Sequence, residues 1–107
     1  MAGYFKIETR PDGQFAYELK AGAAVILMSE AYATKAACMN GIESVKKNAA
    51  DEGRYRRTTT PDGHYRFALE SSNGQVVGGS DYFETEAERD AGIEAVQKGA
   101  PDAELED

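Results

Sequence analysis

The sequence predicts an α+β protein in which two tandem β-β-β-α repeats share one antiparallel sheet and both helices pack on one face. Three observations lead to this prediction: a Pro-Asp-Gly turn that occurs twice, the alternating apolar residues that follow each turn, and two later segments with helical spacing. The turns are Pro11-Asp12-Gly13 and Pro61-Asp62-Gly63. Proline presets the first corner, aspartate caps it, and glycine takes the left-handed position that closes a hairpin.

The turns belong to a longer internal repetition. The two halves align without a gap up to Leu19 and Leu69 and, after one inserted residue, again from Val25 and Val76. Identical residues recur at Gly3/Gly53, Thr9/Thr59, Ser29/Ser80, Thr34/Thr85, Gly41/Gly92, Ile42/Ile93 and Val45/Val96. Self-similarity over this length indicates an internal duplication. We therefore interpret residues 1–107 as a single domain, with repeat one at 3–50 and repeat two at 53–107.

Each repeat is expected to form three strands followed by a helix. Alternation and apolar runs predict strands at 4–9, 15–19 and 25–28, and again at 54–59, 65–69 and 76–77. Thr34 and Thr85 stand where helices should begin, at 35–48 and 86–98, because a threonine side chain caps the free N–H groups of a first turn. A glycine inside each helix, Gly41 and Gly92, suggests that the helix backbone lies directly on the sheet. Residues 103–107 are either a short strand or an acidic tail.

Charge and composition restrict the classes of partner. The chain has 107 residues, with 12 basic and 19 acidic side chains and a net charge of −7. A field of this sign repels phosphate backbones and anionic lipid, which disfavours nucleic acid and membrane surfaces as partners. The apolar runs are too short to span a bilayer, no leader sequence is apparent, and a single cysteine suits a reducing compartment. We expect a soluble cytoplasmic protein, monomeric because the duplication completes the sheet.

The segment that leads from the third strand into the first helix reads Ser29-Glu30-Ala31-Tyr32-Ala33-Thr34-Lys35 and continues as Asn40-Gly41-Ile42-Glu43-Ser44-Val45-Lys46-Lys47-Asn48-Ala49. This segment resembles the signature of the YegP-like family, small proteins built from one or two copies of a domain of unknown function. The resemblance covers essentially the whole chain. It implies three-strand-plus-helix units that share one sheet, with a strand exchanged between units, and it implies no catalytic or ligand residues. Repeat two departs from the signature at Asp81, Tyr82, Glu86, Ala91 and Ala95.

The residues themselves show no recognisable catalytic or metal-binding set. His64 is the only histidine, and no carboxylate stands at a metal-ligand spacing from it. Cys38 is interpreted as a small packing residue. The pairs Ser29-Glu30 and Ser80-Asp81 suit general acid–base chemistry, but a carboxylate before a helix is more simply explained by the helix dipole. We therefore predict no enzymatic activity, no metal and no cofactor, and an enzyme centred on these groups is the least favoured hypothesis.

One basic segment interleaved with an aromatic residue is the candidate binding surface. Its residues are Arg54, Tyr55, Arg56 and Arg57, with Arg66 on the paired strand and Tyr82 beside a depression that Gly78-Gly79 would leave. The first hypothesis is a non-catalytic interaction module that takes an unidentified protein or peptide on its open face or by strand addition. The alternative is single-stranded nucleic-acid binding through 54–57. Cross-strand pairing of these arginines with glutamates such as Glu70 explains the same charges structurally.

Overall fold

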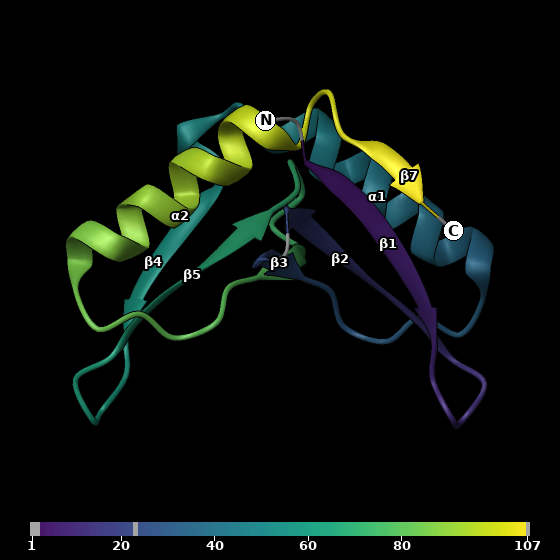
Figure 1. Cartoon of the computed structure of the whole chain (residues 1–107), viewed down its shortest axis with the longest axis horizontal. Helices are drawn as coiled ribbons and strands as arrows, with labels where there is room; N and C mark the ends of the chain where they lie inside the picture. Colours follow the sequence, from purple (N-terminus) through teal and green to yellow (C-terminus); the bar gives the residue numbers. More distant parts are fainter. Residues whose placement is uncertain (1–2, 23, 107) are drawn as a thin grey trace.

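The computed structural model describes residues 3–22 and 24–106, which form one seven-stranded sheet and two helices (Figure 1). The predicted α+β class and single shared sheet are confirmed. The elements are β1 (Tyr4–Thr9), β2 (Phe15–Ala21), β3 (Ala24–Met28), α1 (Lys35–Asn48), the short 3-10 helix η1 (Glu52–Arg54), β4 (Tyr55–Thr59), β5 (Tyr65–Glu70), β6 (Val76–Gly79), α2 (Glu86–Gly99) and β7 (Glu104–Glu106).

Local sequence signals set the turns and the helix starts. Gly13 and Gly63 adopt φ values of 84° and 86°, the left-handed conformation that the hairpins require. The Thr34 hydroxyl oxygen accepts from the Ala37 N–H at 3.1 Å, and the Thr85 hydroxyl oxygen accepts from the Glu88 N–H at the same distance. Both helices therefore begin directly after their capping threonine, as predicted.

The strand order is β4-β5-β6-β3-β2-β1-β7, and the prediction of a wholly antiparallel sheet is wrong. β7 runs parallel to β1, with Glu104 opposite Tyr4, Leu105 opposite Phe5 and Glu106 opposite Lys6. The segment after α1 becomes β4 and pairs with β5, but the equivalent place beside β2 is already filled by β1. The segment after α2 therefore adds outside β1. Residues 104–106 are a strand, and Asp107 lies outside the described residues.

Both helices cover the same face of the sheet. α1 packs on β2, β5 and β6, whereas α2 packs on β2, β3 and β5, so each helix spans strands of both halves (Figure 1). The fully buried strand residues beneath them are Phe5, Tyr17, Leu19, Leu27, Phe67 and Leu69. They form one hydrophobic core with Ile42, Val45, Ile93 and Val96 of the helices. The expected arrangement of two helices on one face agrees with these contacts.

Gly41 of α1 and Gly92 of α2 face aromatic rings rather than sheet backbone. A Cβ atom at Gly41 would lie 2.5 Å from the Tyr32 hydroxyl, and one at Gly92 would lie 2.9 Å from Phe83 Cζ. Each of these rings stacks on a core ring of the adjacent strand, at 6.1 Å between Tyr17 and Tyr32 and 6.2 Å between Phe67 and Phe83. The helix backbones do come close to the sheet layer at these two glycines, as predicted, and the atoms that they approach belong to aromatic rings.

The halves meet at β3 and β6, where the ladder contains one residue pair, Met28 with Gly79. A Cβ atom at Gly78 would lie 2.8 Å from Leu27 Cγ, so the Leu27 side chain fills the space that Gly78 leaves. The Tyr17 hydroxyl donates to the Val77 carbonyl of the other half. Burial raises the pKa of Tyr17, which keeps this hydroxyl a donor.

We predict that Tyr17→Phe lowers the free energy of unfolding by about 1–3 kcal/mol, because it leaves the buried Val77 carbonyl without this donor. Urea denaturation followed by circular dichroism measures the loss. The control is Tyr4→Phe, whose hydroxyl is only part-buried and lies 3.5 Å from the Gly22 carbonyl. We expect a change of about 0.5 kcal/mol or less for this control. Equal effects of the two variants would contradict the assigned role of Tyr17.

Candidate binding surface

The alternation of β4 separates the residues of the candidate surface. Tyr55 points to the helix side and is 8% exposed, with its hydroxyl donating to the Ala49 carbonyl at 2.6 Å. Its ring packs edge-on against Phe67 at 5.9 Å. Burial raises the pKa of the Tyr55 hydroxyl. The prediction that Tyr55 is part of the binding surface is therefore wrong, because the residue belongs to the core.

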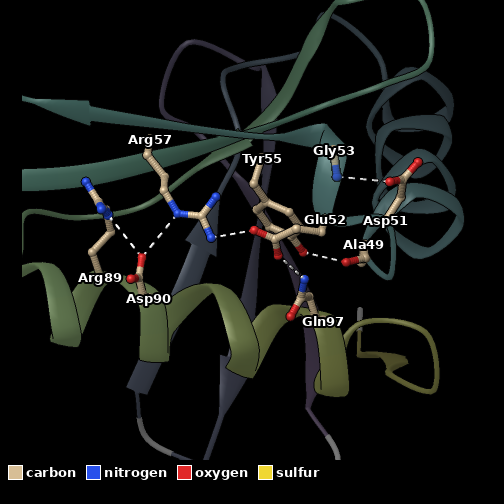
Figure 2. Close-up of polar contacts among 9 residues, drawn as sticks. All are labelled: Ala49, Asp51, Glu52, Gly53, Tyr55, Arg57, Arg89, Asp90 and Gln97. Carbon is tan, nitrogen blue, oxygen red and sulfur yellow. Dashed lines mark hydrogen bonds and ion pairs between the residues drawn. The ribbon is translucent and has the colours of Figure 1, made fainter.

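Arg57 also points to the helix side and fastens β4 to α2. Figure 2 shows its guanidinium between Glu52 and Asp90. Its Nη2 lies 2.5 Å from Glu52 Oε1, and its Nε lies 3.1 Å from Asp90 Oδ1. Gln97 of α2 donates to the second oxygen of Glu52 at 2.7 Å. The Arg57 hydrogen bonds lower the pKa of both carboxyls, Glu52 and Asp90. This arginine therefore already has two anionic partners within the fold.

Arg56 lies on the other side of the strand, away from the helices, and Arg54 is the last residue of η1, directly before the strand. Arg56 is two-thirds exposed (67%), and its Nε lies 2.9 Å from a Glu70 oxygen, the cross-strand pair that the structural explanation anticipated. The Arg54 Nε lies 3.3 Å from Asp51 Oδ2 without hydrogen-bond geometry. Within residues 3–22 and 24–106 that nitrogen makes no hydrogen bond. Each of these two arginines therefore has a carboxylate neighbour within the fold.

Arg66 and Tyr82 form a second cluster on the outer face. The Arg66 guanidinium lies 5.4 Å from the centre of the Tyr82 ring, which is 58% exposed. His64 approaches the same ring edge-on at 6.3 Å, and its Nδ1 lies 3.2 Å from Asp62 Oδ2. A hollow of about 310 Å³ adjoins Arg66 above Gly78 and Gly79. The absent side chain of Gly79 therefore opens space on this face, whereas Leu27 fills the space that Gly78 leaves on the helix face.

A polar hollow that the sequence analysis missed lies between α1 and the turn that joins β5 to β6. It has a volume of about 450 Å³, and α1 lines it with Asn40, Ser44, Lys47 and Asn48. Ser71, Asn73 and Gln75 line it from the turn. Three of the helix residues recur every four positions, so they share one face. The sequence indicates this hollow when the halves are compared: the equivalent residues of α2 are Ala91, Ala95 and Gly99, so this helix face is polar in the first half alone.

The groups considered for catalysis have structural partners. The Ser29 hydroxyl accepts from the Tyr17 N–H at 2.8 Å and donates to the Glu30 carbonyl, and Ser80 does the same with Phe67 and Asp81. These serines replace missing ladder partners at the strand ends. Cys38 is fully buried in the core. Neither His64 nor Cys38 lines the two hollows described above.

Within residues 3–22 and 24–106, no group of three or more histidine, cysteine or acidic side chains could hold a metal ion. No helix in this part of the chain is long and apolar enough to cross a membrane.

The fold and this surface define a class: small α+β proteins with one mixed sheet covered by two helices, basic along one border. Comparison with known proteins places the chain more narrowly. A family model described as a domain of unknown function (DUF1508) matches it twice, at residues 11–55 and 61–107. The chain belongs to this family, which confirms the resemblance found in its sequence.

Relatives and solved structures support the assignment over the full length. A UPF0339 protein in the ptx operon 5' region of Stutzerimonas stutzeri is 46% identical over 98% of this chain and 96% of its own length. The UPF0339 protein YegP of Escherichia coli O157:H7 is 37% identical over 100% of this chain and 98% of its own length. The solution structure of yegP from E. coli superimposes with a TM-score of 0.94 at 36% identity, covering 100% and 93% of the two chains. The solution structure of UPF0339 protein SO3888 from Shewanella oneidensis superimposes with a TM-score of 0.94 at 34% sequence identity, covering 100% of this chain and 92% of that chain.

We predict that Arg57→Met makes the free energy of unfolding less dependent on pH in the acid range. Because Arg57 lowers the pKa of Glu52 and Asp90, the wild type gains stability above the ordinary carboxyl pKa of about 4 and loses it as pH falls through the lowered values. Urea midpoints between about pH 6 and pH 2 measure this loss, which should be smaller in the variant. Arg56→Met removes the same charge from the same strand without touching Glu52 or Asp90. It should retain more of the acid dependence, and identical profiles for the two variants would contradict the role of Arg57.

Proposed function

We propose that this protein is a non-catalytic interaction module that takes an extended segment of an unidentified protein partner onto the sheet edge at β4. The observation that carries the proposal is the difference between the two borders of the sheet. β1 is covered by β7, whereas no strand of the described residues pairs with the outer side of β4 (Figure 1). An open edge offers unpaired backbone groups, which peptide-binding domains use for strand addition.

The pairing of β4 with β5 fixes which backbone groups point outward. Phe67 and Tyr65 direct their N–H and C=O groups toward Ser80 and Phe83, on the side of β5 away from β4. Their partners on β4 are Arg57 and Thr59. In an antiparallel pair the hydrogen-bonding groups of opposite residues point either toward each other or both away. Arg57 and Thr59 therefore present their N–H and C=O groups to the open side.

The edge is also held in place for binding. The ion pairs of Arg57 with Glu52 and Asp90 and the burial of Tyr55 hold the helix face of the strand in place before any partner arrives. A strand that is already ordered loses little conformational entropy when a peptide binds, which favours affinity.

We predict that Thr59→Pro weakens peptide binding about tenfold or more, because proline removes an outward N–H and leaves the β5 ladder intact. Peptides are first selected from a displayed library of random ten-residue sequences on the wild-type protein, and their affinities are then measured by fluorescence polarisation.

Thr9→Pro is the matched control, because Thr9 holds the equivalent place on β1, beyond the residues that β7 covers. It should bind selected peptides as the wild type does. Equal losses in the two variants, or a selection that enriches no peptide, would contradict the proposed edge.

Single-stranded nucleic acid is the second candidate, and the observation that favours it is the exposed Tyr82 ring beside Arg66. A base can stack on such a ring while the guanidinium meets a phosphate. We expect Tyr82→Ala and Arg66→Gln each to weaken a gel shift of oligo(dT) or oligo(U) at low salt. No shift with either oligonucleotide at low salt would remove this candidate.

A further inference from the structure

We infer that the segment accepted at β4 runs parallel to the strand and carries an acidic, an apolar and an acidic side chain in succession. This inference rests on the proposed function and names the chemistry of its partner. The model for this contact lies within the molecule itself, because β7 already pairs in parallel with β1 at the opposite border of the sheet.

β7 supplies the template for the contact. Its sequence is Glu104-Leu105-Glu106, and it runs parallel to β1 beside Tyr4, Phe5 and Lys6. Side chains of neighbouring strands at the same level point to the same face. Leu105 therefore shares the helix face with the buried Phe5, and the two glutamates share the outer face with Tyr4 and Lys6.

β4 presents the same geometry with more positive charge. Tyr55 pairs with Leu69 as Phe5 pairs with Leu19, so the two aromatic residues occupy equivalent places. Arg56 then stands where Lys6 stands on β1, and Arg54, the last residue of η1, aligns in sequence with Tyr4 but directly precedes the strand. An acidic side chain beside Arg56 gains a cation that stays 67% exposed although it pairs with Glu70, and the preceding apolar side chain lies next to the Tyr55 ring. Arg54, whose Nε lies 3.3 Å from Asp51 Oδ2, adds a second cation at the start of the strand.

The helix face of the same edge selects against acidic side chains. There the Arg57 guanidinium is already shared by Glu52 and Asp90, and both carboxylates are more than half exposed. A third carboxylate at this point would meet two like charges. The edge therefore favours acidic residues at alternate positions, on the outer face, over a uniformly acidic strand.

The edge also argues against a second copy of β4 as the occupant. Pairing two β4 strands would bring Arg56 and Arg57 of one copy close to the same arginines of the other, and like charges on paired strands repel. The outer-face arginines point to an acidic segment from a partner.

The contact differs from the template in where its ladder begins. The Tyr55 N–H is bonded to the Glu52 carbonyl that closes η1, so it is not available to a partner. The available groups run from the Tyr55 carbonyl through Arg57 to Thr59. A segment of about five residues covers this length at about 3.3 Å a residue.

The test uses a synthetic peptide with the sequence of residues 101–107, Pro-Asp-Ala-Glu-Leu-Glu-Asp, added to the intact isotope-labelled protein. The control peptide replaces every acid by its amide, as Pro-Asn-Ala-Gln-Leu-Gln-Asn. At low salt the acidic peptide should shift the backbone amide signals of Tyr55–Thr59 and bind at least about tenfold more tightly than the control. Binding should weaken with added salt and in Arg56→Gln, while Lys6→Gln on the covered border should leave it unchanged.

Direction is tested with the same peptide carrying a spin label. Attached to the N-terminus, the label should broaden signals at the Tyr55 end of β4, and attached to the C-terminus, signals at the Thr59 end. The reverse pattern would overturn the parallel arrangement.

The outcomes separate this inference from the proposed function. Equal binding of the two peptides at β4 would overturn the acidic preference and leave strand addition standing. If neither peptide shifts β4, the inference is wrong, and the library selection then decides whether the edge binds any peptide. Shifts confined to β1 and β7 would also overturn the inference. So would a dimer detected by sedimentation whose dissociation on dilution shifts the β4 amide signals, because the occupant of the edge would then be a second copy of the chain.

Discussion

The structure depends on how the two halves are joined across β3 and β6. One residue pair, Met28 with Gly79, connects these strands, so backbone pairing alone contributes little to the junction. Side chains supply the rest: Leu27 fills the space over Gly78, and Tyr17 bonds across to the Val77 carbonyl. Because each helix packs on strands of both halves, the halves share one core and neither buries its apolar face alone.

The same core fixes the functional border. Tyr55 is buried from β4 while Arg57 reaches α2, so the strand at the open edge is held through its helix face and leaves its outer face to the arginines. The other border ends in β7, which pairs with β1. Two borders with similar geometry therefore differ in what they offer to a partner.

Much of the fold is predictable from short-range signals. The capping threonines place both helix starts, and the Pro-Asp-Gly turns place the hairpins, because each depends on a few neighbouring residues. The parallel β7 was not predictable, since a three-residue strand has too short a pattern and its place depends on β1 being occupied. Residues 54–57 do not form one patch, because strand alternation directs Tyr55 and Arg57 to the helix face, and the alignment of Tyr55 with Phe5 already indicates this direction.

Leu27 and Gly78 also limit how alike the halves can become. They take equivalent positions in the two halves, yet they meet at the centre of the sheet, where one isobutyl group fills the available volume. A chain assembled from two first halves would set two leucines in competition for that volume, and one assembled from two second halves would leave it vacant. Sequence drift at either position is therefore coupled to its counterpart, and the junction enforces asymmetry on an otherwise repetitive molecule.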